Sequence, residues 1–383
     1  KGPGVDRSGD ALKHANAAGT SPHGGVMALM GDDHTAKSST LAHQSEYAMM
    51  DAMIPVLSPA GVQEFLDLGL HGFSMSRFSG CWTGFKCVTT TVDSSASVYV
   101  DPDRIKIILP DDVTIPADGL NIRWPDSQLE QEVRLHKYKL AAAQAYARSN
   151  QIDRIIAQGD HDTLGIVAAG KSYLDTRQAL ADLDLDETDL MRLGVRLYKP
   201  ALVWPLETTS LMEFASGLDK IIVVEEKRGL IEDQIKEILF NKQDRPALIV
   251  GKKDETGETL FPSTYQLTSE GIALALAKRI GELGDKEKLT SQAQLLRNRT
   301  TPSSDGAEIL RTPYFCSGCP HNTSTRVPEG SRGLSGIGCH FMVQKMNRNT
   351  ETYTHMGAEG VTWVGQAPFN GNQHVFVNIG DGT

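Results

Sequence analysis

The middle of the chain alternates short apolar runs with amphipathic segments, a pattern that favours a parallel sheet with helices on its faces. Each apolar run is too short for a helix and is flanked by polar residues or breakers. Right-handed crossovers would join these pieces into one small doubly wound domain. The predicted strands cover residues 164–169, 195–198, 220–225 and 247–250, and the predicted helices cover 172–181, 209–215 and 230–240.

The first block shows the same alternation, with many glycines. Its predicted helices cover 10–18 and 59–72, and its predicted strands cover 25–30 and 54–57. Gly19 follows the first helix in the position of a C-terminal cap. The strand at 25–30 ends at the polar turn Gly31-Asp32-Asp33-His34. The pattern therefore predicts a second α/β domain in this part of the chain.

Two further segments are predicted to connect these blocks. The first holds a strand at 105–109 and a helix that begins with the capping-box pair Ser127 and Glu130 and continues towards residue 158. The second covers residues 252–305, which are polar and rich in breakers, and holds one predicted helix at 269–280. Both segments are interpreted as linkers.

Composition sets broad limits on function. The chain has 383 residues, which predicts two or three domains, and 40% of them are hydrophobic, enough for sizeable cores. A net charge of −10 argues against a nucleic-acid surface, which needs clustered Lys and Arg. No apolar run is long enough to span a bilayer, and no signal peptide opens the chain. The first residue is Lys1 and the last residues form a glycine turn, so we expect both ends to be cuts through domains.

Three of the five cysteines lie in one segment, which favours a metal or cluster over a disulfide framework. Cys316 and Cys319 have CxxC spacing, and Cys339 follows within glycines. Two thiolates on one turn can bind a single metal or cluster. A [4Fe–4S] cluster would take a fourth cysteine beyond Thr383, whereas zinc could use His321 or His340. The alternative is that these thiols are buried and unliganded. Cys81 and Cys87 are interpreted as core or loop residues.

A second group of residues is typical of a diphosphate site. An apolar strand empties into Gly380-Asp381-Gly382, downstream of Met356-Gly357. Glycines let backbone N–H groups approach a phosphate, and an aspartate supplies a hard oxygen ligand for Mg²⁺. The same tripeptide also makes ordinary turns. Its position after the cysteine segment favours the diphosphate interpretation.

Three other polar segments are ambiguous. The loop at 31–39 follows a strand, where open α/β sheets bind ligands, but Asp32 and Asp33 also fit a solvated loop. The acidic run 182–189 is predicted to be an exposed helix end or turn. Residues 225–228 follow a predicted buried strand and fit a charged loop, although such strand ends can also contact a partner domain.

Together these motifs resemble the large subunit or fused chain of indolepyruvate:ferredoxin oxidoreductases, which are thiamine-diphosphate-dependent 2-oxoacid:acceptor oxidoreductases. The resemblance covers nearly the whole chain and rests on the order of several motifs. It implies an α/β fold of several doubly wound parallel-sheet domains. It also implies that this chain is an internal fragment of a longer protein. The implied division is 1–100, the end of a pyrimidine-binding domain; 101–159, a connecting segment with a long helix; 160–251, a transketolase-C-terminal-like domain; 252–305, a linker; and 306–383, the start of a truncated diphosphate-binding domain.

The resemblance implies oxidative decarboxylation of an aryl- or branched-chain 2-oxoacid, such as indolepyruvate, to acyl-coenzyme A and CO₂. Thiamine diphosphate, Mg²⁺ and a [4Fe–4S] cluster would be the cofactors, and ferredoxin would accept the electrons. The implied roles are these: Cys316, Cys319 and Cys339 ligate the cluster; Asp381 holds Mg²⁺; Gly380, Gly382 and Gly357 shape the diphosphate site; and His321 lies near the diphosphate or the substrate.

The resemblance also implies what this chain lacks and where it works. The glutamate that activates the cofactor would lie upstream of Lys1, and the asparagine that completes the Mg²⁺ motif would lie beyond Thr383, so the fragment alone is expected to be inactive. A cytoplasmic homodimer, or a complex with a gamma-type domain, is expected, with no membrane or nucleic-acid partner. Two alternatives stay open: a non-redox thiamine-dependent decarboxylase or carboligase, and a zinc-stabilised inactive interaction protein.

Overall fold

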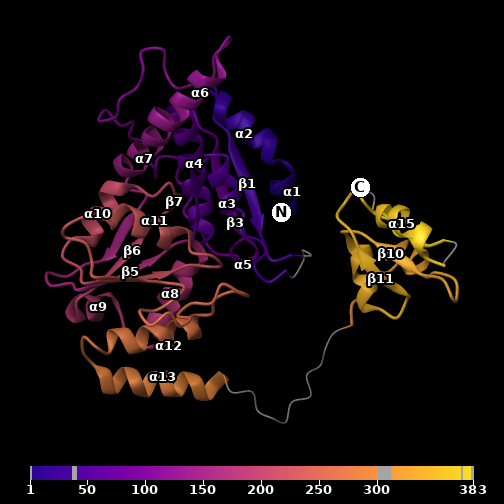
Figure 1. Ribbon diagram of the computed structural model, residues 1–383. Helices are drawn as coiled ribbons and strands as arrows, with labels where there is room; N and C mark the ends of the chain where they lie inside the picture. Colours follow the sequence, from indigo (N-terminus) through magenta and orange to yellow (C-terminus); the bar gives the residue numbers. More distant parts are fainter. Residues whose placement is uncertain (1, 37–40, 301–311, 372–373, 381–383) are drawn as a thin grey trace. The chain divides into compact units, whose positions relative to one another are not determined.

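The computed structural model describes residues 2–36, 41–300, 312–371 and 374–380 (Figure 1). The chain forms two compact units, Lys1–Thr301 and Pro302–Thr383. Three sheets are present in the described residues, two in the first unit and one in the second. The protein is therefore an α/β protein with parallel and mixed sheets, and the predicted fold class is confirmed.

The first sheet of the 1–301 unit has the strand order β1-β3-β2-β7. Its first three strands are parallel, and β7 pairs antiparallel with β2. The strands are β1 (Met27–Asp32), β2 (Val56–Leu57), β3 (Thr83–Val88) and β7 (Leu202–Trp204). Because β7 comes from the middle of the chain, it joins the predicted first and middle blocks into one unit.

The second sheet has the order β4-β6-β5-β8-β9, parallel except for the edge strand β4. Its strands are β4 (Arg154–Ala157), β5 (Leu164–Ala168), β6 (Val195–Lys199), β8 (Lys220–Val224) and β9 (Leu248–Val250). Along β5, Ile166 and Ala168 pack into one core while Val167 packs into another. Successive side chains point to opposite faces, so a strand that is covered on both faces has a continuous apolar run.

Helices cover both sheets (Figure 1). One face of the second sheet carries residues of α8, α9, α12 and α13, and the other carries residues of α10 and α11. Helices α4 and α7 pack with the first sheet. The helices of this unit are α1 (Gly2–Arg7), α2 (Gly9–Ala18), α3 (Glu46–Asp51), α4 (Val62–Ser79), α5 (Thr89–Val92), α6 (Gln128–Arg134), a π-helical turn (Leu135–Lys139), α7 (Leu140–Ser149), α8 (Gly170–Asp182), α9 (Glu187–Leu193), α10 (Thr208–Ala215), α11 (Leu230–Leu239), α12 (Ser269–Ile280) and α13 (Lys286–Thr300).

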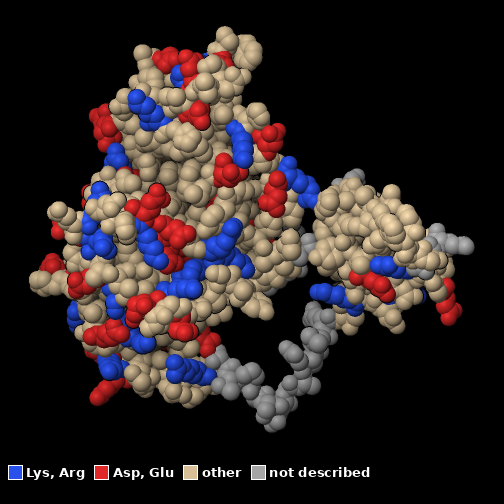
Figure 2. Space-filling view, in the orientation of Figure 1, with Lys and Arg blue, Asp and Glu red and all other residues tan. Residues whose placement is uncertain are grey.

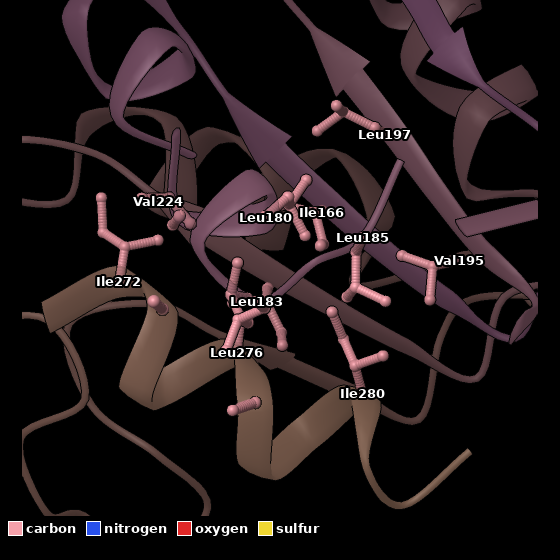
Figure 3. Close-up of a cluster of buried hydrophobic side chains, with 14 of the residues drawn as sticks. Ile166, Leu180, Leu183, Leu185, Val195, Leu197, Val224, Ile272, Leu276 and Ile280 are labelled. Atoms are coloured by element: carbon pink, nitrogen blue, oxygen red, sulfur yellow. The ribbon is translucent and has the colours of Figure 1, made fainter. Parts of the chain in front are cut away.

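The segment predicted as a linker at 252–305 is instead folded onto the second sheet over its described part. It contains two helices, α12 and α13, where one was predicted. Along α12, Ile272, Leu276 and Ile280 recur every four residues and point at the sheet (Figure 3). All three side chains are fully buried. This spacing places them on one helical stripe, and that stripe completes the core.

The other predicted connecting segment also differs from the structure. The helix begins after Ser127 as predicted, and the Ser127 side chain accepts a hydrogen bond from the Glu130 N–H, but α7 ends at Ser149 and not near 158. A left-handed residue, Gln151 (φ 49°), follows, and β4 begins at Arg154. Tyr146 of α7 is fully buried against α4, so this helix is part of the core. The prediction of a helix continuing towards residue 158 therefore missed the antiparallel edge strand β4.

The predicted strand at 105–109 is wrong. These residues form no strand, and Ile107, Ile108 and Leu109 are exposed. The Asn150 side chain pairs with the N–H and C=O of Ile108 at 2.9 and 2.7 Å, taking the place of a neighbouring strand. Elsewhere the first-block predictions hold with shifted ends: α2 ends before Gly19 (φ 97°), and α4 continues beyond 72 to Ser79.

The 302–383 unit holds a small parallel sheet with the order β11-β10-β12. Its described elements are α14 (His321–Ser324), β10 (Gly333–Ser335), the 3₁₀-helix η2 (Cys339–Lys345), β11 (Thr350–Tyr353), α15 (Val361–Gln366), the 3₁₀-helix η3 (Ala367–Phe369) and β12 (Phe376–Val377). The names given above to the domains of the chain stay predictions. Among the described residues, no helix is both long and apolar enough to cross a membrane.

Candidate functional site

The CxxC segment forms a tight turn in the 302–383 unit. The Cys319 N–H donates to the Cys316 carbonyl oxygen at 3.0 Å, and Gly318 occupies the left-handed region with φ 78°. The Asn322 side chain also donates to the Cys316 carbonyl oxygen, at 3.0 Å. The turn therefore holds both cysteines on one short loop, with Cys316 exposed and Cys319 half-buried.

Two histidines lie beside this turn. The His321 Nδ1 atom is 3.3 Å from the Cys319 sulfur, and the His321 ring stacks on Phe315 and on His340. Arg348 donates to the His321 carbonyl oxygen at 3.2 Å, which fixes the start of α14. His340 is buried, and its Nε2 atom has no hydrogen-bond partner in the described part of the chain. Burial, followed by the charge of His321, lowers the pKa of His340.

The third predicted cluster ligand is not gathered with the first two. Cys339 begins η2 and is exposed. In the described residues, no group of three or more His, Cys, Asp or Glu side chains is placed to hold a metal ion. The described arrangement therefore offers a two-thiol turn without a complete cluster site, and the assignment of Cys316, Cys319 and Cys339 stays a prediction.

Two of the four glycine and aspartate residues predicted for the diphosphate site, Gly357 and Gly380, are among the described residues. Gly357 has φ 86°, a conformation that favours glycine, and its N–H donates to a Glu359 carboxylate oxygen at 2.8 Å. Gly380 follows β12, and the two residues of that strand are exposed and not buried as predicted. Asp381 and Gly382 lie outside the described residues. Their role in holding Mg²⁺ and diphosphate stays a prediction.

A second candidate site lies in the 1–301 unit, where the carboxyl ends of strands from both sheets converge. A cavity of about 30 Å³ is lined there by residues that follow or end β1, β2, β3, β5 and β8. This is the edge at which open α/β sheets bind ligands. The lining residues that carry charge or hydrogen-bonding groups are His34, Glu46, Ser58, Lys86, Lys171, Ser172, Glu225 and Glu226.

Charged side chains in this cavity are paired with one another. Lys86 forms an ion pair with Glu46 and lies 3.9 Å from Asp32. Lys171 forms ion pairs with Asp175 and, at 3.0 Å, with Glu226. Both lysines are almost completely buried. Removing one partner of such a pair would leave a buried charge uncompensated, so each pair constrains the packing around its own sheet.

His34 occupies a special position in this network. It is 3% exposed, and neither ring nitrogen has a hydrogen-bond partner among the described residues. Burial, followed by the charges of Lys86, Lys227 and Lys171, lowers the pKa of His34 to about 2. The ring is therefore neutral at physiological pH, with one N–H donor and one acceptor lone pair available.

Two of the polar segments that were ambiguous in the sequence place acidic residues in the interior here. Asp32 and Asp33 are 1% and 3% exposed, and Asp32 accepts hydrogen bonds from the N–H and hydroxyl of Ser45. Glu225 is also buried and accepts the N–H groups of Ile231 and Glu232 at the start of α11, while burial raises its pKa. The solvated interpretation of Asp32 and Asp33 is therefore wrong, whereas residues 225–228 do form a charged loop, which is largely buried. The acidic run 182–189 does form a helix end and turn, as predicted.

Sequence reasoning did not single out Lys86, Lys171 or Glu46. A signal was present for Lys86, which interrupts the apolar strand Thr83–Val88 and is charged at a buried position. Lys171 follows β5 at the start of α8, where Gly170 has φ 53° and an added Cβ would lie 2.4 Å from the Ser58 hydroxyl oxygen. That close approach, visible only in the folded chain, brings the two sheets together at the cavity.

Sequence comparisons with known proteins find relatives in the family that the sequence motifs resemble. Residues 154–302 match the model of the indolepyruvate oxidoreductase domain. The chain is 24% identical over 364 residues to the indolepyruvate oxidoreductase subunit IorA of Thermococcus kodakarensis, covering 90% of this chain and 51% of that protein. It is 26% identical to the Archaeoglobus fulgidus subunit of the same name, covering 94% of this chain and 54% of the relative. The chain thus spans about half the length of the curated relatives it matches.

Solved structures give weaker similarities. The 2-oxoglutarate:ferredoxin oxidoreductase from Magnetococcus marinus, solved with 2-oxoglutarate, coenzyme A and succinyl-CoA bound, aligns with a TM-score of 0.46 and 15% identity over 73% of this chain and 52% of that one. A split-gene transketolase described as an inactive beta4 tetramer aligns with a TM-score of 0.36 and 15% identity, covering 67% of this chain and 66% of the other.

Proposed function

Because this chain is an IorA-like protein, related to the 2-oxoacid:ferredoxin oxidoreductases, we propose that it is part of an enzyme that oxidatively decarboxylates an aryl- or branched-chain 2-oxoacid to acyl-coenzyme A and CO₂, with ferredoxin as acceptor. The observation that carries the proposal is the sequence similarity to IorA subunits over most of the chain. The expected setting is cytoplasmic, in a homodimer or with a gamma-type domain.

The chemistry of the reaction would come from bound cofactors. Thiamine diphosphate with Mg²⁺ supplies the electron sink for decarboxylation, and an iron–sulfur cluster supplies one-electron transfer. The CxxC turn supports this part of the proposal because it presents Cys316 and Cys319 on one loop. Gly357 supports it by its left-handed conformation, which lets the backbone turn tightly beside a ligand.

The residues near the turn would act by positioning. The His321 Nδ1 atom lies 3.3 Å from the Cys319 sulfur, so the imidazole can hydrogen-bond that sulfur. Arg348 donates to the His321 carbonyl and to the Thr325 hydroxyl, which holds α14 in place. These contacts keep the loop ordered around the two thiols.

The test uses the complete protein, purified without oxygen. With thiamine diphosphate, Mg²⁺, coenzyme A and indolepyruvate present, we expect reduction of methyl viologen. The reduction should be lost in Asp381→Ala and in Cys316→Ser, and retained in Cys87→Ala, a matched control because Cys87 is a half-buried thiol of β3 in the other unit.

Two outcomes would contradict the proposal. Release of CO₂ without viologen reduction would place the protein among non-redox thiamine-dependent decarboxylases or carboligases. Bound zinc without iron, together with inactivity towards aryl- and branched-chain oxoacids, would leave a zinc-stabilised interaction protein. Iron, sulfide and zinc analysis of the same preparation separates these outcomes.

A further inference from the structure

An open groove lies on the outer side of the buried cavity in the 1–301 unit. Its volume is about 580 Å³, within the range of small-molecule sites. Four hydroxyl-bearing residues and two basic residues line it: Thr35, Ser263, Thr264, Tyr265, Lys227 and Arg228. Figure 2 shows Lys and Arg atoms beside Asp and Glu atoms in the middle of one face of this unit. The groove thus combines positive charge with hydroxyl donors.

Three loops that meet at the groove have left-handed backbone at residues other than glycine. The positions are Ala36 (φ 55°), Lys227 (φ 58°) and Tyr265 (φ 57°). The Lys227 ammonium group donates to the backbone carbonyls of His34 and Tyr265, and so ties the three loops together. Strained backbone of this kind persists where the surroundings hold it, and it clusters at ligand sites.

Arg228 is held by its own contacts and keeps its terminal nitrogens available. Its guanidinium lies 3.8 Å from the centre of the Tyr47 ring, and its Nε and backbone N–H both donate to the Gln44 side-chain oxygen at 3.2 and 3.1 Å. No hydrogen bond of its Nη atoms is found within the described part of the chain, and the side chain is exposed. A guanidinium fixed at Nε and free at its Nη atoms is prepared to bind a planar or tetrahedral oxyanion.

His34 connects the groove to the inner cavity, because it lines both. Its buried ring nitrogens have no hydrogen-bond partner among the described residues, and a buried polar group in that state costs free energy until a partner arrives. Two nearby carboxylates are already engaged: Glu226 pairs with Lys171 at 3.0 Å and lies 3.8 Å from the His34 Nδ1 atom, and Asp6 lies 3.2 Å from His43.

We propose that this groove is a binding site for the oxyanion of a small molecule, a carboxylate or a phosphate, with Arg228 as the principal charged contact and the His34 ring and the hydroxyls of Thr35 and Thr264 as further partners. The site draws on the polar loop after β1, which the proposed redox chemistry does not use. It requires neither the cysteine segment nor residues 381–383, so the two proposals can fail separately.

The experiment measures binding to the 383-residue chain by titration calorimetry with three probes: inorganic phosphate, phenylpyruvate and coenzyme A. In Arg228→Gln we expect the dissociation constant of the bound probe to rise about 10-fold or more, because one charge-assisted contact is lost. Arg245→Gln is the matched control, because Arg245 is also an exposed arginine over an aromatic ring, Phe240, but lies outside the groove.

The probes distinguish the source of the oxyanion. Tighter binding of phenylpyruvate than of phosphate assigns the groove to a carboxylate substrate, and the reverse ranking assigns it to a phosphate-bearing ligand. Arg228→Lys keeps the positive charge and loses the planar pair of guanidinium donors, so it should give intermediate affinity. This variant replaces Arg228→Gln in the test if the Gln variant does not fold. Absence of saturable binding of every probe up to about 10 mM, or equal affinity in Arg228→Gln and the parent chain, would overturn the proposal.

Discussion

The two units of the protein treat their chemically reactive residues differently. In the 1–301 unit, Lys86 and Lys171 are buried and paired with carboxylates of the same chain. In the 302–383 unit, Cys316 and Cys339 are exposed, and the described residues complete no metal site around them. A reactive side chain that is buried and paired with a charged side chain of the same chain stabilises the packing. A reactive side chain that is exposed and unpaired in the described residues is available to bind a ligand.

The largest effect is expected for the buried lysine. Lys86→Met should lower the free energy of unfolding by about 3–5 kcal/mol, because Glu46 and Asp32 would remain buried without their counter-ion. The double variant Lys86→Met/Glu46→Gln should recover part of that loss. Urea unfolding measures both, and the exposed Lys242→Met is the control. A loss no greater than in the control would mean that the network does not stabilise the unit.

A second prediction tests whether residues 269–300 belong to the core. Leu276→Ala on α12 should cost about 2–5 kcal/mol of unfolding free energy, since the fully buried side chain leaves a cavity. Leu295→Ala on α13 should change stability by less than about 0.5 kcal/mol, because that side chain is 50% exposed. An effect of Leu276→Ala as small as that expected for Leu295→Ala would restore the interpretation of this segment as a linker.

The third prediction concerns pH. Burial raises the pKa of Asp153 from 3.8 to about 7. Between these values the folded chain retains a proton that the unfolded chain has lost, so this residue makes stability fall as pH rises from about 4 to 7, by at most about 1.4 kcal/mol per pH unit. Asp153→Asn should remove this fall. The effect is measured as the difference between the pH–stability profile of the variant and that of the unsubstituted chain. Asp111→Asn, at an exposed position, should leave the profile unchanged.

A smaller effect is expected at the start of α12. The Thr268 hydroxyl accepts a hydrogen bond from the Gly271 N–H at 3.1 Å, as an N-cap does. Thr268→Ala should therefore cost about 1 kcal/mol, and Thr268→Ser should retain most of the stability. Thermal unfolding of the three proteins gives the comparison, and a Ser variant as unstable as the Ala variant would assign the loss to something other than the cap.

The smallest effect is expected in the other unit. In metal-free protein, Cys316→Ser should change the free energy of unfolding by less than about 0.5 kcal/mol, because the side chain is exposed. In protein purified without oxygen, the same change should reduce the iron content. A large loss of stability without metal would show that the thiol is a packing residue, which contradicts the contrast between the two units.

The candidate sites were predictable to different degrees. The tight CxxC turn follows from residue types at short spacing, and the structure shows such a turn at Cys316–Cys319. The buried cavity could not be found in this way, since Lys86, Lys171 and Glu226 come from separate strand ends. Asp32 and Asp33 looked like solvated residues because their partners are not neighbours in the sequence.

The sequence by itself indicated the parallel strands of the middle block and the helices between them, because short apolar runs between polar breakers favour buried strands. The order of several motifs also indicated the resemblance to indolepyruvate:ferredoxin oxidoreductases, and the sequence comparisons with IorA subunits agree with it. The tertiary structure alone decided that β7 joins the first sheet, that α12 and α13 complete the second core, and that charged strand ends meet in one cavity. These features depend on contacts between residues far apart in the chain, and local periodicity carries no record of such contacts.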